Sequence, residues 1–152
     1  MSKEAVREFL KNQHLAVVST ADLDTNLEAS LVYFIADECF NIFFLSKTET
    51  TKVKNINKNP KVAIVIGLEN KPKSIKASGT AEVVNGSSEY ADIKKRLINR
   101  ITERSNYWPP LNNLDKGSLT LVKITPTSMS YYDATNFGNN AATEEEVYFK
   151  II

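Results

Sequence analysis

The spacing of apolar residues predicts one short helix followed by three strands in the first third of the chain. Ser2 is a suitable N-cap for a helix that ends near Asn12, and apolar residues recur in it at helical spacing: Ala5, Val6, Phe9 and Leu10. Three later segments combine β-branched or aromatic residues with flanking polar turns: residues 14–20, 27–36 and 40–45. We therefore expect these strands to be joined by hairpins.

The rest of the chain continues this mixture of strands and occasional helices. Pro60 ends a short helix at Asn59, since the residue before a proline avoids helical dihedrals. Gly79 marks a bulge or a tight bend of the kind that closes small barrels. The other expected elements are a buried strand over 61–67, a strand over 74–84, a helix over 88–104 and final strands over 118–124 and 128–133. Six or seven short strands with hairpin connections predict a mainly β fold with helices, built on a small antiparallel barrel.

The predicted helix over 88–104 has one apolar stripe and one basic face. The stripe consists of Tyr90, Ile93, Leu97 and Ile101, and the basic face of Lys94, Lys95, Arg96, Arg100 and Arg104. Acidic residues interleave with the basic ones, which favours a solvated helix face over a nucleic-acid surface.

Length and composition limit the classes of protein that this chain can be. Its 152 residues fit one domain, and a net charge of +1 gives no global attraction to nucleic acid or to a membrane surface. Cys39 and His14 are the only residues of their kinds, which excludes an intrachain disulfide and a zinc site of several Cys and His ligands. The N-terminus lacks the apolar core of a signal peptide, and no apolar run reaches the ~18 residues of a membrane span. We expect a cytoplasmic protein.

The segment between residues 46 and 52 has the composition of an anion site. It follows an apolar strand, opens a short helix, and offers four hydroxyls and two ammonium groups: Ser46, Thr48, Thr50, Thr51, Lys47 and Lys52. The first N–H groups of a helix are unpaired and carry the positive end of its dipole, so a phosphate is the natural ligand. The alternative is an ordinary loop whose threonines cap the helix while the lysines face solvent.

This order of a strand, a Ser/Thr/Lys turn and then Lys52-x-x-Asn55-x-x-x-Asn59-Pro60 resembles the pyridoxamine-5′-phosphate-oxidase-like flavin split barrels. The resemblance covers roughly two-thirds of the chain and includes residues 14–20, 29–34 and 75–82. It implies a homodimer of six-stranded antiparallel split barrels with FMN at the subunit interface. Residues 1–133 would form the FMN-binding domain, and residues 134–152 a tail that docks on the barrel or on the partner subunit.

The resemblance also implies roles for individual residues. Ser46 matches the family's hydroxyl at the strand end, Lys52 its phosphate-facing lysine, and Thr51 stands where the family often has an arginine. The cofactor-binding residues expected in this way are Ser30, Val32, Ser46, Lys47, Thr51, Lys52, Ser74 and Lys76. A plain barrel strand at Ser30 and Val32, and a solvated edge strand at Ser74 and Lys76, are the alternatives.

The C-terminus departs from true pyridoxamine-phosphate oxidases, which carry a Trp…Arg-Leu-His-Asp-Arg segment that this chain lacks. The resemblance therefore implies an FMN-binding oxidoreductase of the general stress protein type that acts on another small molecule. One alternative is a reductase that uses a deazaflavin coenzyme. Another is a flavin or heme carrier or sensor without turnover, in which His14 could serve as an axial ligand.

Overall fold

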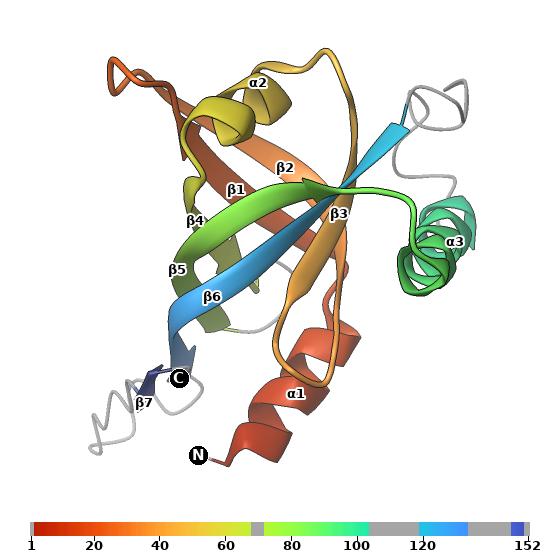
Figure 1. Cartoon of the computed structure of the whole chain (residues 1–152). Coiled ribbons are helices and arrows are strands. Elements are labelled where there is room, and N and C mark those ends of the chain that lie inside the picture. Colours follow the sequence, from red (N-terminus) through yellow and green to blue (C-terminus); the bar gives the residue numbers. More distant parts are fainter. Residues whose placement is uncertain (1, 68–71, 104–118, 134–146, 151–152) are drawn as a thin grey trace.

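The computed structural model of the chain describes residues 2–67, 72–103 and 119–133, together with the backbone of residues 147–150 (Figure 1). Three helices and seven strands follow one another in the order α1 (Lys3–Asn12), β1 (Leu15–Ala21), β2 (Leu27–Ala36), β3 (Ile42–Lys47), α2 (Thr51–Lys58), β4 (Lys61–Ile66), β5 (Lys73–Val84), α3 (Ser88–Glu103), β6 (Leu119–Asp133) and β7 (Val147–Lys150). The predicted strand start at residue 118 and most of the tail lie outside the described residues.

Strands β1 to β6 close into an antiparallel barrel, as predicted. The sheet order is β3-β2-β1-β4-β5-β6-β7, and an additional pairing of β3 with β6 closes it. The first half of β6 pairs with β3 as far as Ile124, and its second half pairs with β7 over residues 128–131. The last strand therefore extends the sheet at the point where β6 leaves β3.

Two hydrophobic clusters explain why some strands alternate and others do not. The main cluster fills the barrel and includes Val6 and Leu10 of α1 and Val53 and Ile56 of α2, and these helices lie at opposite ends of the barrel (Figure 1). A second cluster lies under α3 and includes Ile35, Phe43, Leu45, Leu97 and Leu121. Because α3 covers the outside of β2 and β3 there, both faces of residues 32–35 and 42–45 are buried.

The prediction of a buried strand over 61–67 is wrong for half of its residues. In β4, Val62, Ile64 and Ile66 are buried, whereas Ala63 and Val65 point outward and are exposed. Since β4 lies between β1 and β5, away from α3, only its inner face is covered. The sequence is apolar on both faces although only one face is buried within the chain.

Gly79 lies at the predicted bulge. Ser78 pairs with Ser128 and Gly79 with Pro126, so the register shifts there and Thr127 is the extra residue on β6. The expectation of two final strands is wrong, because the bulge accommodates Thr127 and β6 runs without a break from Leu119 to Asp133. Pro126 has no N–H to donate, and a bulge is one of the few positions in a sheet that tolerates it.

The hairpins β1–β2 and β2–β3 share one turn motif, Asp-x-x-x-Asn. Asp22 Oδ1 accepts the backbone N–H groups of residues 24 and 26, and Asp37 Oδ1 accepts those of residues 39 and 41, each at 2.9 Å. The hydrogen bonds that Asn26 donates hold the pKa of Asp22 below its ordinary value. Phe40, predicted to begin a strand, belongs instead to this turn and has φ 66°.

Candidate functional site

The turn between β3 and α2 is closed by its own hydroxyl groups. Ser46 is buried at the end of β3, and its Oγ lies 2.9 Å from Thr50 Oγ1. Thr50 Oγ1 also donates to the backbone oxygen of Lys47 at 3.0 Å. These bonds fix the direction in which the chain enters α2, so Ser46 acts inside the turn rather than on its surface.

The N-terminus of α2 differs from those of the other two helices. Ser2 Oγ accepts from Ala5 N in α1, and Ser87 Oγ accepts from Tyr90 N in α3, and both helices carry an acidic residue in the first turn. In α2 the N-cap Thr50 makes no side-chain cap bond and the first turn has no acidic residue. The first N–H groups of α2 therefore keep their capacity to bind an anion.

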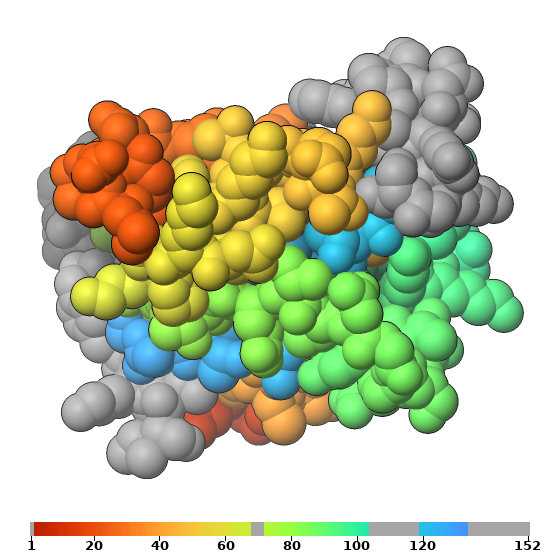
Figure 2. Space-filling model, turned by 45° about the horizontal axis from the view of Figure 1, so that its top comes forward, coloured from red at the N-terminus to blue at the C-terminus, as the bar shows by residue number. Residues whose placement is uncertain are grey.

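The side chains around this helix start are cationic or hydroxylated, which fits a phosphate. Lys47 and Thr51 are exposed and Lys52 is half-buried. Within the described part of the chain, neither lysine has an ion pair or a side-chain hydrogen bond. Glu49 is exposed in the same turn and places a carboxylate near them. Figure 2 shows α2 at the molecular surface, between the β1–β2 turn and β5.

A buried polar network joins α2 to β1 and β2. Asn55 is 6% exposed and its Nδ2 donates to Thr20 Oγ1 at 3.1 Å, while Thr20 Oγ1 donates to Glu28 Oε2 at 3.1 Å. Ser30 Oγ donates to the other oxygen of Glu28. Sequence reasoning selected Ser30 but missed the other three residues. The position of Asn55 within the Lys52-x-x-Asn55 motif was the available signal.

Ser30 and Val32 share a face of β2, but the two side chains have different surroundings. Ser30 is half-buried beside Glu28, whereas Val32 is 6% exposed and packs in the main core. A ligand outside the barrel could therefore touch Val32 only through its backbone.

Ser74 and Lys76 are not brought together with the turn before α2. The segment that follows α2 meets β5 at Ala81, whose N–H donates to Pro60 O at 2.8 Å. Lys76 precedes Ala81 by five residues, about 17 Å along a strand. Lys76 pairs instead with Val65 and Ser130, so its side chain lies on the outward face of the sheet.

Other candidate groups lie toward the end of the barrel that is remote from α2. His14 precedes Thr20 by six residues, about 20 Å along β1. At that end, Lys73 Nζ lies 2.8 Å from Asp133 Oδ2, and this hydrogen bond raises the pKa of Lys73. Burial raises the pKa of Tyr131 beside them. The three groups are therefore separate from the anion-binding turn.

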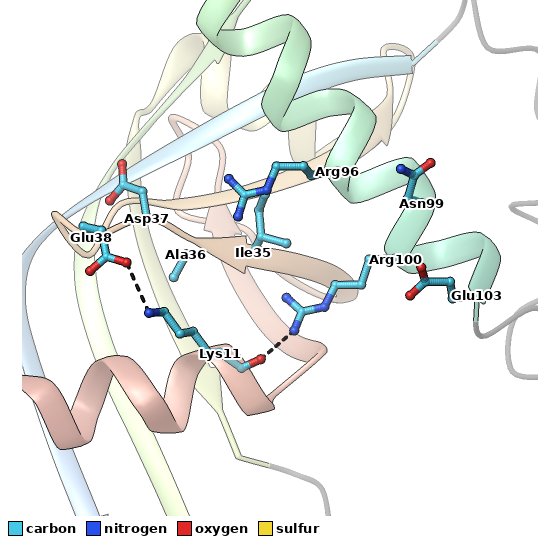
Figure 3. Close-up of a pocket in the computed structure, with 9 residues that line it drawn as sticks. All are labelled: Lys11, Ile35, Ala36, Asp37, Glu38, Arg96, Asn99, Arg100 and Glu103. Carbon is cyan, nitrogen blue, oxygen red and sulfur yellow. Dashed lines mark hydrogen bonds and ion pairs between the residues drawn. The ribbon is translucent and has the colours of Figure 1, made fainter.

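A cavity of about 520 Å³ lies between α3, the end of α1 and the β2–β3 hairpin (Figure 3). Most of the charged groups that line this cavity already form ion pairs or hydrogen bonds within the chain. Lys11 pairs with Glu38 at 3.2 Å, and Asp37 accepts the hydrogen bonds of its turn. Arg100 donates to Phe34 O at 3.1 Å and to Lys11 O at 2.7 Å. Lys94 of α3 likewise donates to Leu119 O, so the basic face of this helix is only partly solvated.

Replacing Arg100 with alanine should lower the free energy of unfolding by about 2 kcal/mol, because hydrogen bonds from a charged donor contribute about 1.5–3 kcal/mol and this site is partly exposed. Urea unfolding followed by circular dichroism measures the change. Arg96, exposed one turn earlier on the same helix, is the matched control, and Arg96→Ala should change stability by less than about 0.5 kcal/mol. Equal effects of the two substitutions on the free energy of unfolding would contradict a stabilising role for the hydrogen bonds of Arg100.

The described part of the chain contains no group of three His, Cys, Asp or Glu residues arranged to hold a metal ion. Among its helices, none combines the length and apolar character needed to cross a membrane.

The family model described as pyridoxamine 5'-phosphate oxidase matches residues 2–133. The chain belongs to this family. No curated protein sequence matches the chain. Membership agrees with the barrel topology.

Several solved structures share the fold of this family member. General stress protein 26 from Bacillus anthracis str. Sterne aligns with a TM-score of 0.70 at 17% identity, over 97% of each chain. An FAD-binding protein from Mesorhizobium loti aligns with a TM-score of 0.68 at 14% identity, over 86% of this chain and 94% of that one. The heme storage protein HutZ from Vibrio cholerae aligns with a TM-score of 0.63 at 18% identity, over 82% of this chain and 89% of that one. At these identities the likeness concerns the fold.

Proposed function

We propose that this protein binds FMN, with the phosphate at the N-terminus of α2, and that it is an oxidoreductase for a small molecule. The observation that carries the proposal is the uncapped start of α2, which lies between the two lysines Lys47 and Lys52. Family membership supports a flavin as the ligand, and the similar fold of an FAD-binding protein is consistent with it.

Each residue of the turn would make a different contribution to phosphate binding. Lys52 would supply the nearest full positive charge, and Thr51 a hydroxyl donor. The first N–H groups of α2 would donate to phosphate oxygens along the helix axis. Ser46 and Thr50 would keep this turn closed through their mutual hydrogen bond. When bound, FMN supplies the hydride and electron transfer, and the protein supplies orientation and electrostatics.

We further propose that the protein is a homodimer with the cofactor where two subunits meet. The outward side of three adjacent strands, β2, β1 and β4, carries a set of apolar residues that no described helix covers: Val17, Leu27, Ala29, Leu31, Ala63 and Val65. Leu27 is 83%, Leu31 40% and Val65 36% exposed. A contiguous apolar patch of this kind favours a protein partner. Ser74 and Lys76 border it, from where they could reach a ligand held by the partner's turn.

Replacing Leu31 with aspartate should convert the dimer to a monomer, because a buried, unpaired carboxylate is costly in an interface. Sedimentation velocity at several concentrations measures the change. Thr80→Asp, at an exposed position of β5 outside the apolar patch, is the control and should leave the dimer intact. A wild-type protein that stays monomeric at all concentrations would contradict the proposal.

The second candidate is a flavin or heme carrier or sensor without turnover. Two observations favour it: Thr51 stands where the family often has an arginine, and the fold is shared with a heme storage protein. A reductase that uses a deazaflavin coenzyme is a further alternative within the same family.

Anaerobic mixing of the FMN-loaded protein with NADH or NADPH separates these functions. An oxidoreductase should bleach the flavin absorbance within seconds to minutes and recover it on addition of an electron acceptor, over repeated cycles. A carrier should keep its oxidised spectrum under the same conditions. The second result would contradict the enzymatic proposal while leaving FMN binding intact.

A further inference from the structure

We infer that Asn55 and Thr20 are positioning residues for the anion-binding start of α2, and that they act without touching the ligand. This inference rests on the proposed function, because it concerns how the phosphate-binding groups are held in place. The link is a chain of hydrogen bonds that leads from α2 into the two adjacent strands β1 and β2.

Two of the three buried side chains of α2 cannot fix the rotation of the helix by themselves. Val53 and Ile56 are 1% and 3% exposed and pack in the main core. Apolar burial keeps the helix on the barrel, but it has no directional preference. The third buried side chain is Asn55, whose amide needs a partner at a defined distance and angle. Asn55 is therefore the buried side chain that sets the rotation of α2 about its axis.

The partner of Asn55 is itself held in a single orientation. Asn55 Nδ2 donates to Thr20 Oγ1 at 3.1 Å, and Thr20 Oγ1 donates to Glu28 Oε2 at 3.1 Å. An ionised carboxylate only accepts, so the hydroxyl proton of Thr20 points to Glu28 and its lone pairs face Asn55. Thr20 and Glu28 are register partners in β1 and β2, and Ser30 donates to the second oxygen of Glu28. The chain of hydrogen bonds thus ends in the sheet.

Asn55 lies on the same face of α2 as the groups proposed to bind the phosphate. Thr51 and Lys52 precede it by four and three residues, and residues at these spacings are neighbours on a helix surface. A rotation of α2 would therefore move Lys52 and the first N–H groups together. Binding groups must be held to within about 0.5 Å of their productive positions, so such a rotation would weaken the contact with an anion.

The test compares Thr20→Val with Thr20→Ser. Valine has nearly the shape of threonine but removes the acceptor of Asn55, whereas serine keeps the hydroxyl. Fluorescence titrations with FMN and riboflavin give the ratio of the two affinities, which isolates the contribution of the phosphate. We expect this ratio to fall about fivefold in Thr20→Val and to change by less than about twofold in Thr20→Ser. Asn55→Ala breaks the same link from the helix side and should lower the ratio by a similar factor.

Two further measurements separate positioning from a general loss of stability. Amide hydrogen exchange of the ligand-free protein should be faster at residues 54–58 of α2 in Thr20→Val than in Thr20→Ser. Ile75→Val trims a fully buried core side chain two residues from Lys73, at the end of the barrel remote from α2. This control should lower the thermal stability and leave the ratio of affinities unchanged.

A ratio that stays at the wild-type value in both Thr20→Val and Asn55→Ala would overturn the inference, even if both variants are less stable. A ratio that falls as far in Ile75→Val would also overturn it, because stability rather than the hydrogen bond would then control binding. A wild-type protein that binds FMN no more tightly than riboflavin would contradict the proposed phosphate site, and this inference with it.

Discussion

Replacing Lys52 with alanine should weaken FMN binding by about tenfold to a hundredfold, since a charge-assisted hydrogen bond to a phosphate contributes about 1.5–3 kcal/mol. Lys52 has no partner of its own among the described residues, so its removal leaves no buried group unpaired. Riboflavin, which lacks the phosphate, should lose less than about twofold in affinity. Fluorescence titration with each flavin at low salt measures both effects.

Lys54 provides the matched control for this substitution. It lies on the same helix two residues later and is exposed, so Lys54→Ala removes the same charge from the other side of α2. Its effect on FMN affinity should be less than about threefold and should disappear at high salt. Equal effects of Lys52→Ala on FMN and riboflavin would place the phosphate elsewhere.

Replacing Gly79 with alanine should destabilise the barrel by about 3 kcal/mol or more, out of a typical 5–15 kcal/mol. A Cβ at this position would lie 2.3 Å from Thr125 O and 2.8 Å from Pro126 Cα. Both atoms belong to the backbone of β6, so the strands β5 and β6 would have to separate at the bulge. Urea unfolding followed by far-UV circular dichroism measures the loss of stability.

The substitution Gly86→Ala is a control that distinguishes backbone strain from steric overlap. Gly86 has φ +91°, but a Cβ there would meet nothing within 4 Å. Gly86→Ala should therefore cost only about 1–2 kcal/mol, the penalty of a left-handed conformation. If the two alanine variants unfold at the same urea concentration, the close approach at Gly79 is not a determinant of barrel stability.

The elements that sequence alone predicts well are those with strong local signals. Ser2 and the helical spacing of residues 5–10 define α1, and the Asn59-Pro60 pair ends α2. The turn before α2 also has a local signature, because hydroxyl and ammonium groups follow a strand directly. Gly79 could be placed at the bulge because glycine inside a strand has few other uses.

The features that sequence reasoning missed depend on contacts between distant residues. The unbroken burial of residues 32–35 comes from α3, which begins more than fifty residues later. The exposure of Ala63 and Val65 depends on which strands α3 leaves uncovered. The network at Glu28 requires Asn55 to reach Thr20 across 35 residues. The Lys52-x-x-Asn55 motif draws attention to Asn55, but it does not indicate which distant side chains Asn55 meets.

The most direct test of FMN binding at the start of α2 is an equilibrium titration of the purified protein with FMN, followed by flavin absorbance and fluorescence, with riboflavin in parallel. A phosphate site at the start of α2 predicts saturable, stoichiometric FMN binding with shifted absorbance bands, and an affinity at least about tenfold higher than for riboflavin. Absence of FMN binding, or equal affinities for the two flavins, would contradict a phosphate site at the start of α2.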